Sequence, residues 1–161
     1  MMNFLSGLFA RGDAVLSEAG ARDAAAIAAL HGVSFARGWT EQEVEGLLID
    51  RHVIAHRAMN GSAMAGFILS RLVEDEAEIL SVAVSKARRA RGLARTLLNL
   101  HLRRLAGLGA RSVFLEVDEH NAPAIALYSR AEFHEISRRP NYYAGTGGKA
   151  AAALVLRRDL V

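Results

Sequence analysis

Four arginines crowd one short segment, RRARGLART, at residues 88–96, and a single glycine interrupts them. Guanidinium groups neutralise phosphate charge, and the first amides of a helix bind anions because they have no partner within the helix. Gly92 carries no side chain, so a phosphate can approach the backbone at that position. The segment therefore predicts a socket for a diphosphate at the start of a helix, surrounded by Arg88, Arg89, Arg91 and Arg95.

The same arginines fit two other interpretations, a solvated surface cluster and a nucleic-acid-binding stripe. A stripe normally includes aromatic side chains or a broader basic face. Arg103 and Arg104 follow on the same predicted helix without an interleaved aromatic, and the formal net charge is only +3. Neither common nucleotide loop, G-x-x-x-x-G-K-S/T or G-x-G-x-x-G, occurs in the segment. We therefore favour the phosphate socket and expect no direct nucleic-acid partner.

Two further side chains stand out by their surroundings. Glu116 interrupts the apolar run FLEV, and a carboxylate inside such a strand needs a partner, access to solvent or a raised pKa. Alternation alone also allows an ordinary surface glutamate there. Tyr128 lies in a predicted helix, where a lone tyrosine is more often a core residue with a solvated hydroxyl. The residues by themselves do not decide between a functional role and these ordinary structural roles for Glu116 and Tyr128.

Apolar periodicity, caps and turn residues predict the elements that carry these groups. We expect a helix capped by Asp23, one from a Thr40–Glu43 capping box, one across 92–109 and one across 121–131. The helix across 92–109 has a broad apolar face made of Leu93, Leu97, Leu98, Leu102, Leu105 and Leu108. We expect strands at 14–19, 52–58, 63–72, 77–85, 111–117, 133–140 and 152–160. This order predicts an α/β fold with a single mixed, mostly antiparallel sheet of about six or seven strands, flanked by helices on both faces.

Length and composition exclude several classes of protein. The 161 residues are 52% hydrophobic and 23% charged, as in one globular domain, which we assign to residues 13–161 after an extension at residues 1–12. The chain has no cysteine, which excludes disulfides, thiolate metal sites and a cysteine nucleophile. The six histidines form no metal-ligand pattern, so we expect no metal. We find no membrane span or secretory signal and expect a cytoplasmic protein.

Two segments resemble the Gcn5-related N-acetyltransferases, the GNAT family. The run ILSVAVSKARRARGLARTLL (79–98) is similar to the family signature of a strand, a connector of the form Q/R-x-x-G-x-G/A and a helix, with Arg89, Gly92 and Ala94 at the defined positions. The run FLEVDEHNAPAIALYSRAEF (114–133) resembles the family's second acetyl-CoA segment. RRPNYYAGTGG (138–148) resembles the branch that acetylates the N-terminal alanine of a small-subunit ribosomal protein.

The resemblance implies direct acetyl transfer from acetyl-CoA to an amine. An amine attacks in its neutral form, and an α-amino group, with a pKa of about 8, loses its proton more easily than lysine at about 10.4. The position that matches the family base is Glu116, and the position that matches the acid for the departing thiolate is Tyr128. The implied partners are acetyl-CoA and the N-terminus of a ribosomal protein, bound by a monomer or weak dimer.

The same resemblance implies the binding residues. Cofactor contacts fall on the strand, the basic loop and the second segment, at Val82, Ala83, Val84, Arg89, Ala90, Arg91, Gly92, Leu93, Ala94, Arg95, Asn121 and Tyr128. Asn121 is also a plain helix cap. Substrate contacts fall on Trp39, Tyr142 and Tyr143, with packing between the early helices as the alternative for Trp39 and ordinary surface aromatics as the alternative for the tyrosines.

Three departures from the family pattern bear on acceptor choice. Glu132 stands before Phe133 where the family has glycine, and a left-handed turn costs a non-glycine residue about 1 kcal/mol. Pro140 precedes the two tyrosines and is expected to shift them, and GGKAAAAL lacks the acidic residue often found near the last strand. Acetylation of a small-molecule amine or a lysine, a non-catalytic acyl-CoA sensor and a nucleic-acid-binding module therefore remain as alternatives.

Overall fold

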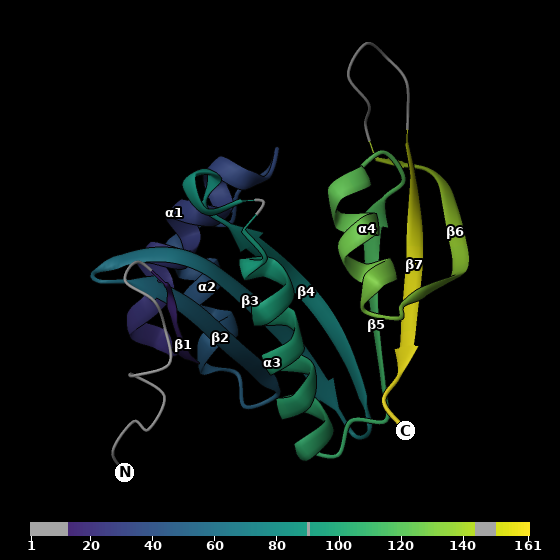
Figure 1. Ribbon diagram of the computed structural model, residues 1–161, viewed down its shortest axis with the longest axis horizontal. Coiled ribbons are helices and arrows are strands. Elements are labelled where there is room, and N and C mark those ends of the chain that lie inside the picture. Colours follow the sequence, from purple (N-terminus) through teal and green to yellow (C-terminus); the bar gives the residue numbers. More distant parts are fainter. Residues whose placement is uncertain (1–12, 90, 144–150) are drawn as a thin grey trace.

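The computed structural model describes residues 13–89, 91–143 and 151–161, which form one seven-stranded sheet and four α-helices (Figure 1). The predicted extension at residues 1–12 and Ala90 of the basic loop lie outside the described residues. The elements are β1 (Val15–Glu18), α1 (Ala24–Ser34), α2 (Glu41–Ile49), β2 (Val53–Asn60), β3 (Ala63–Val73), β4 (Glu76–Val84), α3 (Leu93–Gly107), β5 (Ser112–Asp118), α4 (Ala122–Arg130), β6 (His134–Tyr143) and β7 (Ala151–Asp159).

The strands follow the order β1-β2-β3-β4-β5-β7-β6, and every neighbouring pair is antiparallel except β4 with β5. The predicted mixed, mostly antiparallel sheet is therefore confirmed. The parallel pair is short, because it joins only residues 76–78 of β4 to residues 112–114 of β5. Beyond Glu78 the two strands diverge and open the sheet into a V (Figure 1).

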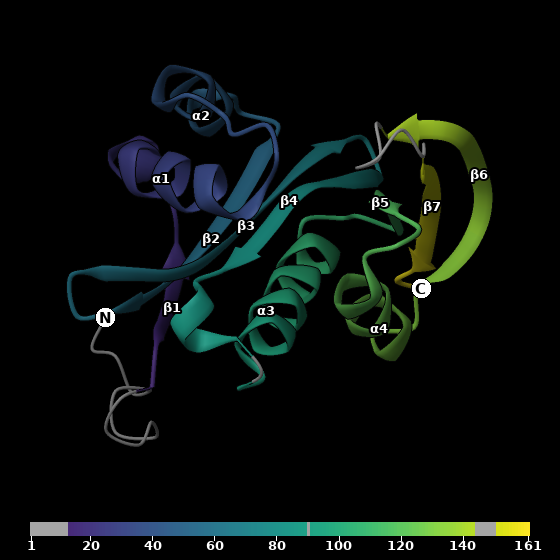
Figure 2. The same cartoon turned by 90° about the horizontal axis from the view of Figure 1, so that it is seen from above.

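Helices cover both faces of the sheet, as the sequence predicts (Figure 2). On one face, α1 and α2 pack Ile27, Leu30 and Val44 against Phe67 and Leu69 of β3. On the other face, α3 and α4 cover a second core, and the α3 leucines in it are Leu97, Leu98, Leu102 and Leu105. The predicted leucine face of α3 is one residue too long, because Leu108 is exposed past the end of the helix.

A buried polar group lies where α3 crosses β2 and β3. The Nδ1 atoms of His56 and His101 are 2.7 Å apart, and Nε2 of His101 is 2.6 Å from the Ser70 hydroxyl. All three side chains are buried, and the two rings meet edge to face at 4.9 Å. Burial, with a smaller effect from His56, lowers the pKa of His101 to about 3, and burial also lowers the pKa of His56. Both imidazoles are therefore neutral at neutral pH.

Local signals set most element ends. Thr40 and Glu43 form the predicted capping box at α2, and the Asn121 side chain accepts from the Ala124 amide at α4. The prediction that Asp23 caps α1 was wrong. Its carboxylate accepts instead from the Gly20 amide, at 2.9 Å, and pairs with Arg57 of β2, because this buried acid gains more from a cation than from a helix amide.

Two of the departures from the family pattern, Glu132 and Pro140, affect the backbone differently. Glu132 keeps the left-handed conformation, with a φ of 69°, so the turn after α4 has the shape that glycine would give it. Around Pro140, β6 bulges away from β7: Arg139 pairs with Ala153, but the next pair is Tyr143 with Ala151. Proline has no amide hydrogen to donate to the ladder, which explains why the bulge forms there.

Candidate active site

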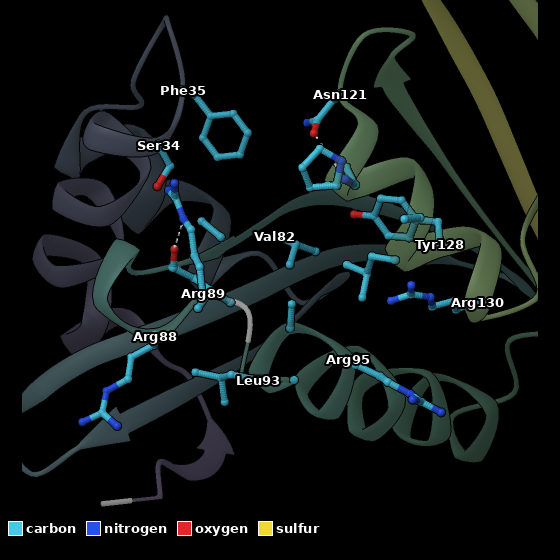
Figure 3. A pocket seen from close by; sticks show the side chains of 18 residues that line it. Ser34, Phe35, Val82, Arg88, Arg89, Leu93, Arg95, Asn121, Tyr128 and Arg130 are labelled. Atoms are coloured by element: carbon cyan, nitrogen blue, oxygen red, sulfur yellow. Dashed lines mark hydrogen bonds between the residues drawn. The ribbon is translucent and has the colours of Figure 1, made fainter.

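The V between β4 and β5 holds a cavity of about 660 Å³ (Figure 3). It is bounded by the carboxyl half of β4, the start of α3, one side of α4 and the end of α1. Ten of the predicted cofactor residues line it: Val82, Ala83, Val84, Arg89, Gly92, Leu93, Ala94, Arg95, Asn121 and Tyr128. Arg91 is not among the lining residues, and Ala90 lies outside the described residues.

The basic loop gives one end of this cavity its anion-binding character. Gly92 has a φ of 76° and directly precedes α3, so the first amides of the helix face a position without a side chain. Arg89 donates from Nε to the Val84 carbonyl, at 3.2 Å, which joins the loop to the end of β4. Arg88 and Arg89 lie at one side of the cavity, and Arg95 and Arg130 lie at the other (Figure 3). Guanidinium groups thus flank the helix start from both sides.

A buried tyrosine, Tyr128, also lines the cavity. Tyr128 is 7% exposed, its ring packs edge-on against Phe133 at 5.5 Å, and its hydroxyl points into the cavity (Figure 3). Burial raises the pKa of Tyr128 to about 12, so the hydroxyl keeps its proton at physiological pH. Asn121, at the start of the same helix, caps α4 and also lines the cavity. Its two possible roles are therefore compatible.

Glu116 lies on the opposite face of the sheet from Tyr128. Its neighbours Leu115 and Val117 are buried in the core under α3 and α4, so alternation turns Glu116 toward the α1–α2 side. Its side chain is 24% exposed, and Oε1 is 3.0 Å from Nη2 of Arg139 on β6. The arginine also stands over the Tyr142 ring, 5.5 Å from its centroid. The partner that the sequence requires for Glu116 is Arg139, and Glu116 does not line the cavity of Tyr128.

A second carboxylate on the same face, Glu78, was not predicted from the sequence. Glu78 is the last residue of β4 that pairs with β5, so it sits where the strands begin to diverge. Burial and then the charge of Glu116 raise the pKa of Glu78, whereas Arg71 opposes them. Like Glu116, Glu78 interrupts an apolar strand, AEILSVAV, and that signal could have identified it.

Glu78 lines a second cavity, of about 410 Å³, together with the predicted substrate residue Trp39. The other lining residues are Arg37, Glu43, Leu47, Arg71 and Leu80. Trp39 also packs against the core of the early helices, as the alternative interpretation expects, and its role in substrate binding stays a prediction. Tyr142 is exposed beside Arg139. Tyr143 is described by its backbone alone, which pairs with Ala151.

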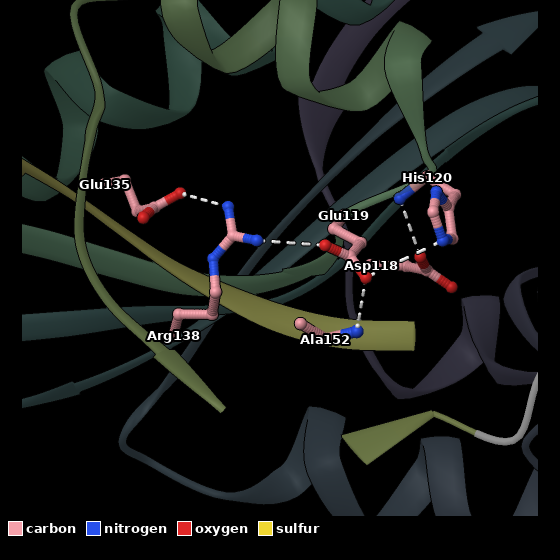
Figure 4. Close-up of polar contacts among 6 residues, drawn as sticks. All are labelled: Asp118, Glu119, His120, Glu135, Arg138 and Ala152. Atoms are coloured by element: carbon pink, nitrogen blue, oxygen red, sulfur yellow. Dashed lines mark hydrogen bonds and ion pairs between the residues drawn. The ribbon is translucent and has the colours of Figure 1, made fainter. Parts of the chain in front are cut away.

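A network of charged groups holds the connection from β5 to α4 (Figure 4). Arg138 of β6 binds Glu119 at 3.0 Å and Glu135 at 3.2 Å. Glu119 also accepts from the Ala152 amide of β7, at 2.9 Å. Two successive arginines of β6 thus bind three carboxylates: Arg138 binds Glu119 and Glu135, and Arg139 binds Glu116. The network fixes the connection that leads to Asn121 and Tyr128.

Across residues 13–89, 91–143 and 151–161, no three histidine or acidic side chains gather in a way that could hold a metal ion. Within the same described ranges, no helix is both long and apolar enough to cross a membrane.

Comparison with known proteins gives consistent results. The model of a family described as the acetyltransferase (GNAT) family matches residues 25–133. The ribosomal protein bS18-alanine N-acetyltransferase of Escherichia coli K12 is 34% identical over 117 residues, which are 73% of this chain and 78% of that protein. The crystal structure of the E. coli ribosomal-protein-S18-alanine N-acetyltransferase superimposes with a TM-score of 0.85 at 28% identity, over 91% of this chain and 94% of that one. Arabidopsis thaliana NAA60 in complex with acetyl-CoA has the same fold, with a TM-score of 0.80 at 19% identity, over 91% and 98%.

Proposed function

The chain belongs to the GNAT acetyltransferase family, and from that premise we propose that it acetylates the N-terminal α-amine of a ribosomal protein. The family uses acetyl-CoA, and the chain is an acetyl-CoA-dependent N-acetyltransferase. The acceptor in this proposal is the N-terminal alanine of a small-subunit ribosomal protein. It is supported by the E. coli relative, which acts on the alanine of bS18 and of which the chain spans 78%.

One observation carries the proposal: the cavity in the V combines an open strand edge, a helix start and a buried acid. Past Glu78, β4 pairs with none of the described strands on the β5 side, so its backbone from Val82 to Val84 offers amide and carbonyl groups to an extended ligand. The pantetheine arm of coenzyme A is such a ligand. Its diphosphate would then lie at Gly92 and the start of α3, between the guanidinium groups of the cavity.

The proposed reaction needs one proton removed and one supplied. The neutral α-amine attacks the thioester carbonyl carbon, the carbon–sulfur bond breaks, and the coenzyme leaves as a thiolate. Glu116, with Glu78 beside it on the acceptor face, takes the proton that the amine nitrogen releases. Tyr128 donates its proton to the thiolate from the other face, and its raised pKa keeps that proton available. No covalent enzyme intermediate is required.

Mass spectrometry of the small-subunit ribosomal proteins tests the acceptor, in cells with and without the gene. We expect one protein to lose an N-terminal acetyl group when the gene is deleted. In vitro, peptides beginning with Ala, Ser or Met are compared with a lysine peptide, a polyamine and an aminoglycoside. Faster turnover of a lysine side chain or a small amine than of every α-amine peptide contradicts the proposed acceptor but leaves the family assignment intact.

A further inference from the structure

We propose that His31 is a positioning residue that holds the segment between α1 and α2 in its binding shape, and that it does so only while its imidazole is neutral. The inference rests on the proposed function for its kinetic consequence, since the segment borders both cavities of the site. The contacts centre on His31, which neither the family resemblance nor the mechanism above uses; one of its partners, Trp39, is the predicted substrate residue.

The first contact is a hydrogen bond. His31 lies in the last turn of α1 and is 4% exposed. Its Nδ1 accepts from the backbone amide of Trp39, eight residues further along the chain, at 3.0 Å. An imidazole nitrogen that accepts carries no proton, so the hydrogen of the neutral ring is on Nε2. The bond joins the helix end directly to the far end of the segment.

The second set of contacts is aromatic. The His31 ring stacks on Trp39 with centroids 4.1 Å apart and planes 11° apart, and it lies 4.4 Å from the Phe35 ring. Phe35 lines the cavity of about 660 Å³, which we assign to acetyl-CoA, and Trp39 lines the cavity of about 410 Å³ on the acceptor side. One imidazole therefore contacts a wall of each cavity.

The backbone closes tightly around this ring. A Cβ atom added to Gly38 would lie 2.8 Å from the Cα atom of Gly32, so the segment rests directly on α1 at this point. The Phe35 amide also donates to the His31 carbonyl, at 3.0 Å. The path from Ser34 to Trp39 is thus pinned near both ends. A change in the His31–Trp39 bond acts on a segment that has little room to repack.

Protonation removes the acceptor. A proton on Nδ1 makes that nitrogen a donor facing the Trp39 amide, which is also a donor. The charged group that acts on the ring is Glu43 of α2, which pairs with Arg37 of the segment at 3.6 Å; β3 contributes the uncharged Phe67. Burial lowers the pKa of His31 below 6.5, and Glu43 opposes this effect. The bond is therefore intact at neutral pH and is lost as the pH falls below that range.

Three variants separate positioning from mere packing. His31→Leu removes the acceptor and leaves the Trp39 amide unpaired, and we expect the KM of an Ala-first peptide to rise about tenfold. His31→Asn keeps an oxygen near the Nδ1 position that does not titrate, and we expect KM to stay within about threefold. His134→Asn is the matched control, because His134 is exposed at the start of β6. If His31→Leu does not fold, His31→Asn alone carries the test.

Trp39 is the chain's one tryptophan, so its fluorescence reports on this contact without an added label. A protonated imidazole quenches a stacked indole, and we expect quenching below about pH 6.5 in the wild type and the control but not in either His31 variant. The ratio of kcat/KM between wild type and His31→Asn cancels the titration of the acceptor amine. We expect that ratio to fall over the same pH range as the fluorescence.

A flat ratio overturns the positioning role, even if the fluorescence titrates. Fluorescence that titrates equally in His31→Asn overturns the assignment of the titrating group. The proposed function fails separately. If the wild type turns over no α-amine peptide, the dissociation constant of acetyl-CoA replaces KM as the readout, because Phe35 lines the cavity assigned to that ligand. Equal affinities in wild type and His31→Leu then refute the inference.

Discussion

Acidification from about pH 7 to about pH 5 is expected to remove about 2 kcal/mol of unfolding free energy through His101 alone. In the unfolded chain His101 has an ordinary pKa of 6.5, whereas burial lowers it to about 3 in the folded protein. The unfolded state therefore binds more protons between these values. The stability that the neutral ring contributes is fully present above about pH 6.5 and is lost as the pH falls to about 3. The total loss of unfolding free energy over this range is about 5 kcal/mol.

Urea unfolding at several pH values measures this loss. His101→Leu leaves the Ser70 hydroxyl and His56 Nδ1 without their His101 partner, so it costs about 1–3 kcal/mol at neutral pH. The variant has no His101 to protonate. Between about pH 7 and about pH 5 it therefore loses about 2 kcal/mol less unfolding free energy than the wild type. His134→Asn, at an exposed histidine, keeps the wild-type slope. Equal losses on acidification in wild type and His101→Leu refute the reasoning, because His101 is the one titrating side chain that the substitution removes.

Four other outcomes are expected. Glu116→Gln lowers kcat about 10²–10⁴-fold while calorimetry finds the same dissociation constant for acetyl-CoA; unchanged turnover removes Glu116 from its role. Glu78→Gln lowers kcat less and moves the acid limb of the kcat/KM profile, because the pKa of Glu78 is raised in the folded protein. Tyr128→Phe lowers the rate constant of acetyl transfer in single-turnover assays without abolishing the binding of acetyl-CoA. An equal loss of affinity for acetyl-CoA points to a packing role instead. Glu132→Gly relieves the φ of 69° and raises the free energy of unfolding by about 0.5–1 kcal/mol, measured in urea. The substitution also removes the pair with Arg158, but Glu132 is exposed there, so this loss is small.

Local patterns in the sequence were enough to predict the elements and the basic loop at one end of the cavity between β4 and β5. The capping box at Thr40 and the leucines of α3 act through neighbours within a turn or two, so the printed sequence contains the whole interaction. The basic loop is similar: Gly92 and the start of α3 lie next to each other in sequence and in space. The lining of the cavity by Asn121 and Tyr128 was predicted through the family resemblance, since spacing alone left both open.

Long-range pairing explains what the sequence could not predict. Asp23 is drawn from its helix to Arg57, which is 34 residues away in the chain. Glu78 interrupts an apolar strand as Glu116 does, but its place where β4 stops pairing with β5 depends on strand divergence, which has no local sequence signal. The sequence does not distinguish His31 from other residues of its helix, because its contact with Trp39 forms only when the chain folds back on α1. In each case the decisive partner is distant in sequence.

The position of β7 has a consequence for how the protein is made. β7 follows β6 in sequence but lies between β5 and β6 in the sheet, with seven residues of β5 paired along it. Until residues 151–159 have left the ribosome, β5 exposes a long unpaired edge, and β6 has no strand on which to dock. The second half of the sheet therefore forms in one late step of synthesis. Pauses in translation before residue 151 prolong the period in which the nascent chain is open to aggregation and chaperone capture.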